Sequence, residues 1–206
     1  MFVMPAIGIT GGISTGKSTF VECLRELVPD TTSFNADEAA HELLNRPEVQ
    51  EQIRREFGAR VFASTGDLNR TKLRAIVFAD ATKKLALEQI LHPRIRRQWR
   101  TEAKGHRNSP KFFFADIPLL YETGGESLCD RVVVVACSQK VQLARLRKRL
   151  SVRSADAKQM INSQMPLEEK IRRADHVVWN NGDRTSLMEQ ARFLVASWHE
   201  QTWTKR

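Results

Sequence analysis

One eight-residue stretch near the start of the chain constrains the fold more than any other: Gly11-Gly12-Ile13-Ser14-Thr15-Gly16-Lys17-Ser18. It matches the pattern G-x-x-x-x-G-K-[ST], in which glycines allow the backbone to wrap around an anion. The apolar run 6–10 before it predicts a short buried strand, and 18–28 after it carries apolar residues at helical spacing. Because the motif requires this order of strand, loop and helix, we predict a loop that cradles a polyphosphate.

The residue types of this loop indicate how it holds a nucleotide. Its backbone N–H groups and the positive end of the following helix dipole would face the phosphates. Lys17 would reach the β- and γ-phosphates, the Ser18 hydroxyl would hold a bridging Mg²⁺, and Thr19 would lie near the α-phosphate. The alternative is a chance match on a glycine-rich turn, which the strand and helix context disfavours.

Length and cysteine usage limit the class of protein. The 206 residues suffice for one α/β domain with insertions. Cys23, Cys129 and Cys137 are widely spaced in apolar surroundings, which predicts reduced core residues without metal-ligand spacing. The sequence has no apolar run of about eighteen residues and no signal-peptide pattern at its start. We therefore expect a cytoplasmic protein with no membrane attachment.

The formal net charge of +9 invites a nucleic-acid interpretation. Basic residues cluster in 94–107 and 145–153 but otherwise alternate with acidic ones. A protein that handles phosphate-rich small molecules needs cationic walls too. The chain has a single tyrosine and no strand that interleaves aromatic and basic residues. We expect neither a nucleic-acid partner nor an obligate protein partner.

Two aspartates follow predicted strands and so mark the expected ligand edge of a sheet. Asp37 lies just past the short strand 32–35, where it could accept a proton from an attacking hydroxyl or hold a magnesium-bound water. Alternatively, it caps a helix that begins near Glu38. Asp116 ends the apolar run 111–116 and has the character of a second, Walker B-type magnesium carboxylate, although turn chemistry alone also places aspartate there.

A largely helical insertion occupies residues 38–107. Apart from a weak strand pattern at 60–62, it consists of successive helical patterns, at 38–45, 48–57, 71–78, 83–91 and 93–105. His92-Pro93 is expected at the junction of the last two helices, where His92 could donate to a substrate oxygen or be a structural residue. An insertion here is where a second substrate would dock.

The C-terminal half alternates strands with helices. We predict strands at 131–137 and 176–179, a turn at 180–182, and helices at 139–150, 155–164, 167–173 and 184–200. The arginine-rich helices after the first of these strands suit a mobile flap that closes over a triphosphate, with Arg145 or Arg149 offsetting charge. The alternative is a solvated basic face in which no single arginine matters.

With these motifs in place, the chain resembles the dephospho-coenzyme A kinases over nearly its whole length. The strings Pro-Leu-Leu-aromatic-Glu and Gln-Met-Pro-Leu-Glu-Glu-Lys are far more specific than the phosphate loop. The segments that carry the resemblance are 9–19, 35–37, 91–93, 116–122, 164–170 and 174–182.

The resemblance implies transfer of the ATP γ-phosphoryl group to the ribose 3′-hydroxyl of dephospho-coenzyme A, with Mg²⁺ as cofactor. It implies an α/β, P-loop NTPase-type fold with a parallel five-stranded sheet flanked by helices. The implied nucleotide core comprises 1–37, 108–144 and 174–206, with a helical substrate domain at 38–107 and a lid at 145–173.

Residue roles follow from the resemblance by position. The catalytic residues would be Asp37 as base, Lys17 and Arg149. Acceptor binding would use Asp37, His92, Pro118, Leu119 and Leu120, and the metal would be held by Ser18 and Asp116. ATP would be bound by Gly12, Ile13, Ser14, Thr15, Gly16, Lys17, Ser18, Thr19, Arg145, Arg149 and Asn181.

Three positions depart from the family pattern. Asn35 and Asn180 stand where aspartate is usual, and Ser14 stands where glycine is usual. Two other functions stay open: a kinase of another small acceptor, such as a nucleoside monophosphate, and a nucleotide-dependent binding module without catalysis. Acceptor-dependent release of ADP would separate these functions.

Overall fold

The computed structural model describes residues 5–106 and 109–201. The chain divides into two compact units. One comprises the chain up to Phe34 together with Glu102 onward, and the other is Asn35–Thr101.

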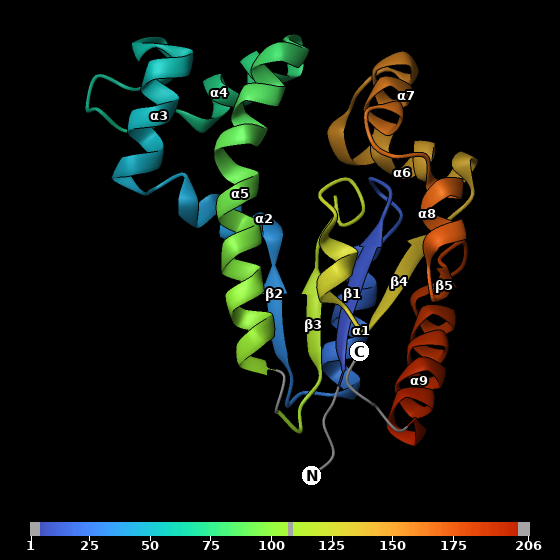
Figure 1. Cartoon of the computed structure of the whole chain (residues 1–206). Coiled ribbons are helices and arrows are strands. Elements are labelled where there is room, and N and C mark those ends of the chain that lie inside the picture. Colours follow the sequence, from blue (N-terminus) through green and yellow to red (C-terminus); the bar gives the residue numbers. More distant parts are fainter. Residues whose placement is uncertain (1–4, 107–108, 202–206) are drawn as a thin grey trace. The chain divides into compact units, whose positions relative to one another are not determined.

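The first unit is built on a five-stranded sheet with the order β2-β3-β1-β4-β5. β1 pairs in parallel with β3 on one side and with β4 on the other, and β5 joins β4 in parallel. Figure 1 shows the strands side by side in this order. The predicted parallel five-stranded sheet is therefore confirmed. The strands are β1 Ala6–Gly11, β2 Thr32–Asn35, β3 Phe113–Asp116, β4 Arg131–Ala136 and β5 His176–Trp179.

Two helices form a core with one face of this sheet. They are α1, Lys17–Leu27, and α9, Arg184–Glu200. Their apolar faces share one buried cluster with alternate residues of the central strands, as the sequence pattern predicts. The largest buried side chain in it is that of Trp198. The carboxyl end of β1 and the start of α1 are thus both anchored in the same core.

Three further helices follow β4. They are α6 Gln139–Leu150, α7 Ser154–Asn162 and α8 Leu167–Arg173. Figure 1 shows α6 and α7 beyond the carboxyl ends of the strands. The Ser138 hydroxyl caps α6 by accepting from the N–H of Val141. A short 3₁₀ turn, Gly125–Leu128, precedes β4.

The second unit is helical. It contains α2 Ala36–Leu43, α3 Pro47–Phe57, the 3₁₀ turn Ala59–Val61, α4 Arg70–Ala79 and most of α5 Ala81–His106. Its own buried cluster includes Val49, Ile53 and Phe57 from one face of α3, with Leu73 of α4. Spacings of three and four residues on α3 explain why this face is buried.

Two sequence expectations for this unit are wrong. The helices expected at 83–91 and 93–105 form one continuous helix, α5, with Pro93 inside it. Proline removes one N–H donor from the helix ladder, and the nearby Ile90 carbonyl accepts from the Arg94 guanidinium at 2.6 Å. The strand expected at 60–62 is instead a 3₁₀ turn followed by a single bridge between Phe62 and Leu68.

The cysteines bear out one simpler expectation, that they are reduced. All three cysteines are free thiols, and Cys23 and Cys137 are buried. Burial raises the pKa of the Cys23, Cys129 and Cys137 thiols, which keeps them protonated. Among residues 5–106 and 109–201, no helix has the length and apolar character needed to cross a bilayer.

Candidate active site

The backbone of the loop between β1 and α1 depends on two glycines. At Gly11 an added Cβ would lie 2.5 Å from the carbonyl oxygen of Val135 on the neighbouring strand. Gly16 has φ of +94°, a left-handed conformation that glycine adopts without strain. Ser14 also has positive φ, 60°, so the loop accommodates a Cβ where the family pattern has glycine, at a strain of about 1–2 kcal/mol.

The start of α1 is prepared for an anion. Gly16 is its N-cap and provides no side-chain acceptor, and the first turn contains no acidic residue. The first N–H groups of a helix have no partner within the helix and carry the positive end of its dipole. Lys17 and Ser18, the first two residues of α1, add an ammonium and an exposed hydroxyl. These features together suit a polyphosphate.

The structure brings Lys17 of the phosphate loop and Asp116 of β3 together, a contact that the sequence motifs do not predict. The Lys17 ammonium forms an ion pair with Oδ1 of Asp116, the last residue of β3. Both side chains are nearly buried, 12% and 7% exposed. Within the described residues, no group of three or more histidine, cysteine or acidic side chains forms a metal cluster. A metal here would need oxygen atoms of the nucleotide to complete its coordination.

Arg145 and Asn180 both hydrogen-bond to the phosphate loop at the Thr15 carbonyl. The Arg145 guanidinium donates to the carbonyl of Thr15 at 3.3 Å and to the carbonyl of Asn180 at 2.9 Å. The Asn180 side chain donates to the same Thr15 carbonyl at 2.9 Å. A carboxylate could not donate this bond, so asparagine suits this position in this chain. Arg149 lies exposed one turn further along α6.

The other nucleotide-side residues have local partners. The Thr15 hydroxyl is buried and donates to the Gly12 carbonyl at 2.9 Å, which closes the loop on itself. The Asn181 side chain accepts from the N–H of Ser138 at 2.7 Å and thereby orders the start of α6. The hydroxyl oxygen of Ser14 is buried and finds no hydrogen-bond partner among residues 5–106 and 109–201.

The segment 117–120, expected on the acceptor side, is tied to the end of β1. The N–H of Ile117 donates to the Ile9 carbonyl at 3.0 Å, and the Thr10 hydroxyl donates to the Pro118 carbonyl at 2.9 Å. Leu120 is fully buried, whereas Pro118 and Leu119 are half-buried.

Asp37 and His92 belong to the second compact unit. Asp37 is exposed in the first turn of α2. The idea that it caps this helix is wrong, because the Asn35 side chain is the cap and accepts from the N–H groups of Asp37 and Glu38. His92 is half-buried within α5, and burial lowers its pKa, partly opposed by Glu88.

A scan against family models matches residues 5–186 to the dephospho-CoA kinase family. The chain belongs to the dephospho-CoA kinase family. A dephospho-CoA kinase from Bacillus cereus is 38% identical over 195 residues, which cover 94% of this chain and 96% of the relative. One from Carboxydothermus hydrogenoformans is 37% identical over 209 residues and the full length of both proteins.

A solved structure agrees with these sequence relatives of the dephospho-CoA kinase family. Dephospho-CoA kinase from Campylobacter jejuni superposes with a TM-score of 0.70 at 28% identity, covering 93% of this chain and 96% of that one. The family named from motifs alone is therefore confirmed.

Sequence reasoning gave no role to four polar residues that surround the phosphate loop. Gln142 donates to the Ile13 carbonyl and Gln164 accepts from the Ile13 N–H, both at 2.9 Å. Nearby, the fully buried Lys170 ammonium forms an ion pair with the partly exposed Glu122 carboxylate at 2.9 Å. Glu122, Gln164 and Lys170 lie in strings that carry the family resemblance, whereas Gln142 lies in none of them. The contacts of all four span more than forty positions of sequence, which no local pattern reveals.

Proposed function

We propose that this chain is a cytoplasmic kinase that uses ATP to phosphorylate the ribose 3′-hydroxyl of dephospho-coenzyme A, giving coenzyme A and ADP. This would be the final step of coenzyme A biosynthesis. The main support is membership of the dephospho-CoA kinase family over residues 5–186, together with an intact phosphate loop. The Lys17 ammonium of that loop meets the Asp116 carboxylate, at the end of β3, at the carboxyl edge of the sheet.

The proposed reaction is an in-line displacement. The 3′-oxygen of the ribose forms a bond to the γ-phosphorus while the bond from that phosphorus to the β,γ-bridging oxygen breaks. The hydroxyl proton passes to the Asp37 carboxylate, which is exposed and accessible to an acceptor. Lys17 offsets the charge on the transferring group.

ATP would be held by the loop residues and by three residues beyond them. Gly12 to Thr19 would surround the phosphates with N–H groups and hydroxyls. We assign Arg149 to the transferring group because its guanidinium is exposed, and Arg145 to shaping the loop through the Thr15 carbonyl. Asn181, which orders the start of α6, would lie on the nucleotide side.

Mg²⁺ fits the donor set at this site. The Ser18 hydroxyl is exposed at the start of α1, and the Asp116 carboxylate already lies against the Lys17 ammonium. Both are hard oxygen donors of the kind that Mg²⁺ prefers, directly or through water. When bound, the ion would offset charge on the β- and γ-phosphates.

Dephospho-coenzyme A would be bound by His92 and by Pro118, Leu119 and Leu120. We assign residues 38–107 to acceptor binding, 145–173 to a lid, and 1–37, 108–144 and 174–206 to the nucleotide core. The lowered pKa of His92 keeps its ring neutral near pH 7, so it can donate one hydrogen bond without adding charge.

The direct test is acceptor-dependent ADP release by the purified chain with MgATP. We expect dephospho-coenzyme A to stimulate ADP release strongly, and nucleoside monophosphates to do so weakly. Lys17→Ala should abolish this release because it removes the ammonium from the phosphate loop. Faster ADP release with a nucleoside monophosphate would overturn the assignment in favour of another kinase. No ADP release with any acceptor would favour a nucleotide-dependent binding module without catalysis.

A further inference from the structure

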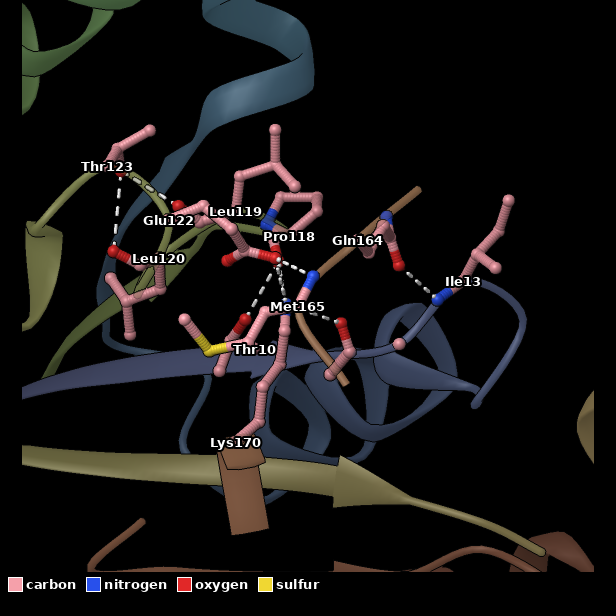
Figure 2. A network of polar contacts seen from close by, with 12 residues as sticks. Thr10, Ile13, Pro118, Leu119, Leu120, Glu122, Thr123, Gln164, Met165 and Lys170 are labelled. Atoms are coloured by element: carbon pink, nitrogen blue, oxygen red, sulfur yellow. Dashed lines mark hydrogen bonds and ion pairs between the residues drawn. The ribbon is translucent and has the colours of Figure 1, made fainter. Parts of the chain in front are cut away.

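Lys170, on α8, is a fully buried ammonium with three acceptors around it (Figure 2). Its Nζ lies 2.9 Å from the Glu122 carboxylate, 2.9 Å from the Pro118 carbonyl and 3.4 Å from the Gly11 carbonyl. An ammonium has three N–H groups and no acceptor, so this arrangement uses all three donors. Burying such a group without partners would be strongly unfavourable.

The two carbonyls belong to the segments that the reaction needs on either side of the phosphoryl group. Gly11 is the last residue of β1 and the first of the phosphate loop. Pro118 lies in the segment assigned to the acceptor, and its carbonyl also accepts from the Thr10 hydroxyl. Lys170 therefore joins the start of the nucleotide cradle to the acceptor-side segment.

The carboxylate partner extends the same network to the chain that returns from the lid. Glu122 Oε1 also accepts from the backbone N–H of Met165 at 3.1 Å. The preceding residue, Gln164, accepts from the N–H of Ile13 inside the phosphate loop at 2.9 Å. Figure 2 shows these residues converging between β1 and the return segment. Residues 164–166, the return segment, thus contact the phosphate loop directly through Gln164 and indirectly through Glu122 and Lys170.

Charge around this network is balanced locally. Burial lowers the pKa of Lys170, while the hydrogen bond and charge of Glu122 raise it and the charge of Lys17 lowers it further. Glu122 therefore favours the ammonium form of Lys170, the form that donates to both carbonyls.

We propose that Lys170 is a positioning residue for phosphoryl transfer: it fixes the phosphate loop, the Pro118 segment and the 164–166 return segment as one body. This rests on the proposed kinase function. Misplacing reacting groups by about 1 Å can cost a hundredfold in rate, so loosening this body should lower kcat. Lys170 itself contacts neither the nucleotide nor the acceptor in this proposal.

The test separates positioning from simple charge balance. Lys170→Met leaves the Glu122 carboxylate without its buried partner, which should lower the thermal midpoint of the protein. Adding Glu122→Gln restores neutrality and retains an oxygen acceptor for the Met165 N–H. We expect the double variant to recover most of its thermal midpoint while its kcat stays roughly ten- to a hundredfold below wild type.

Each outcome decides the proposal. If the double variant recovers both its thermal midpoint and its kcat, Lys170 serves charge balance alone and the proposal is wrong. Full kcat in Lys170→Met would overturn it as well. The control is Lys111→Met. It removes an exposed ion pair of the first unit, between Lys111 and Asp30. It should retain kcat within about twofold, because exposed pairs contribute little.

Gln164→Ala covers the case in which the Lys170 variants fail to fold. Gln164 is only half-buried, so its loss should leave the fold intact while it frees the Ile13 N–H. We expect kcat to fall about tenfold and amide exchange at Ile13 to accelerate. Unchanged kcat with accelerated exchange would refute the coupling. Amide exchange at Ile13 is measured without an acceptor, so it does not depend on the proposed function. If the wild-type chain fails to phosphorylate dephospho-coenzyme A, the proposed function is wrong whatever the exchange result.

Discussion

Gly16→Ala should destabilise the first unit through two effects that the structure separates. At φ of +94°, an alanine is strained by about 1–2 kcal/mol. Its Cβ would also lie 1.9 Å from the Asn180 side-chain nitrogen, which donates to the buried Thr15 carbonyl. Displacing a donor from a buried acceptor costs about 1–3 kcal/mol. We expect a cost in the lower half of this range, because Arg145 still donates to the Thr15 carbonyl.

The two terms together predict a loss of about 2–4 kcal/mol. For a chain of this size, each kcal/mol lowers the thermal midpoint by about 2–4 °C. Thermal and urea denaturation would measure the change. Gly66→Ala is the matched control, because Gly66 has φ of +91° with no atom within 4 Å of the added Cβ. It should show the backbone strain alone.

A double-mutant cycle isolates the contact with Asn180. In an Asn180→Ala background, Gly16→Ala should cost only the strain seen at Gly66, which gives a coupling energy of about 1 kcal/mol or more. Distant sites add within about 0.5 kcal/mol. Additive costs for Gly16→Ala and Asn180→Ala would therefore show that Asn180 does not pack on the loop, and would refute the reasoning.

Three further predictions concern two residues of the second unit and two histidines whose pKa is lowered. Asp37→Asn should lower kcat by about a hundredfold or more while ADP affinity, measured by calorimetry, stays near wild type; unchanged kcat would remove Asp37 as the base. Asn35→Ala should cost about 1 kcal/mol of stability by urea denaturation and Asn35→Asp much less, since aspartate also caps helices; equal costs would contradict the cap. Burial lowers the pKa of His106 and His176, so the unfolded chain binds their protons first and the thermal midpoint should fall as pH drops below about 6.5. His106→Leu should reduce that fall, and an unchanged pH profile would show that His106 does not contribute.

The sequence predicted the sheet well because its signals are local. The β-branched run 131–136 and the phenylalanines before Asp116 specify buried strands by composition alone. The glycine pattern from Gly11 to Gly16 specifies a backbone that few other residues could adopt. The sequence also placed Lys17 and Asp116 at the ends of neighbouring strands, but their ion pair appears only in the folded chain.

The features that the sequence did not predict correctly have physical causes of two kinds. Proline is common at helix starts, so Pro93 predicts one, yet it lies inside the continuous helix α5. A helix can continue through proline at the loss of one backbone hydrogen bond, and no local pattern separates this case from a helix start. The roles of Gln142, Gln164 and Lys170 depend on contacts between segments far apart in sequence. Such contacts exist only once the chain has folded, so no spacing rule predicts them.

The most direct measurement is identification of the product formed from dephospho-coenzyme A and MgATP. Phosphorus NMR of the reaction mixture should show a new phosphomonoester on the ribose 3′-oxygen as ATP is consumed, and Lys17→Ala should form none. A phosphate at any other position, or consumption of ATP without a new phosphomonoester, would contradict the account.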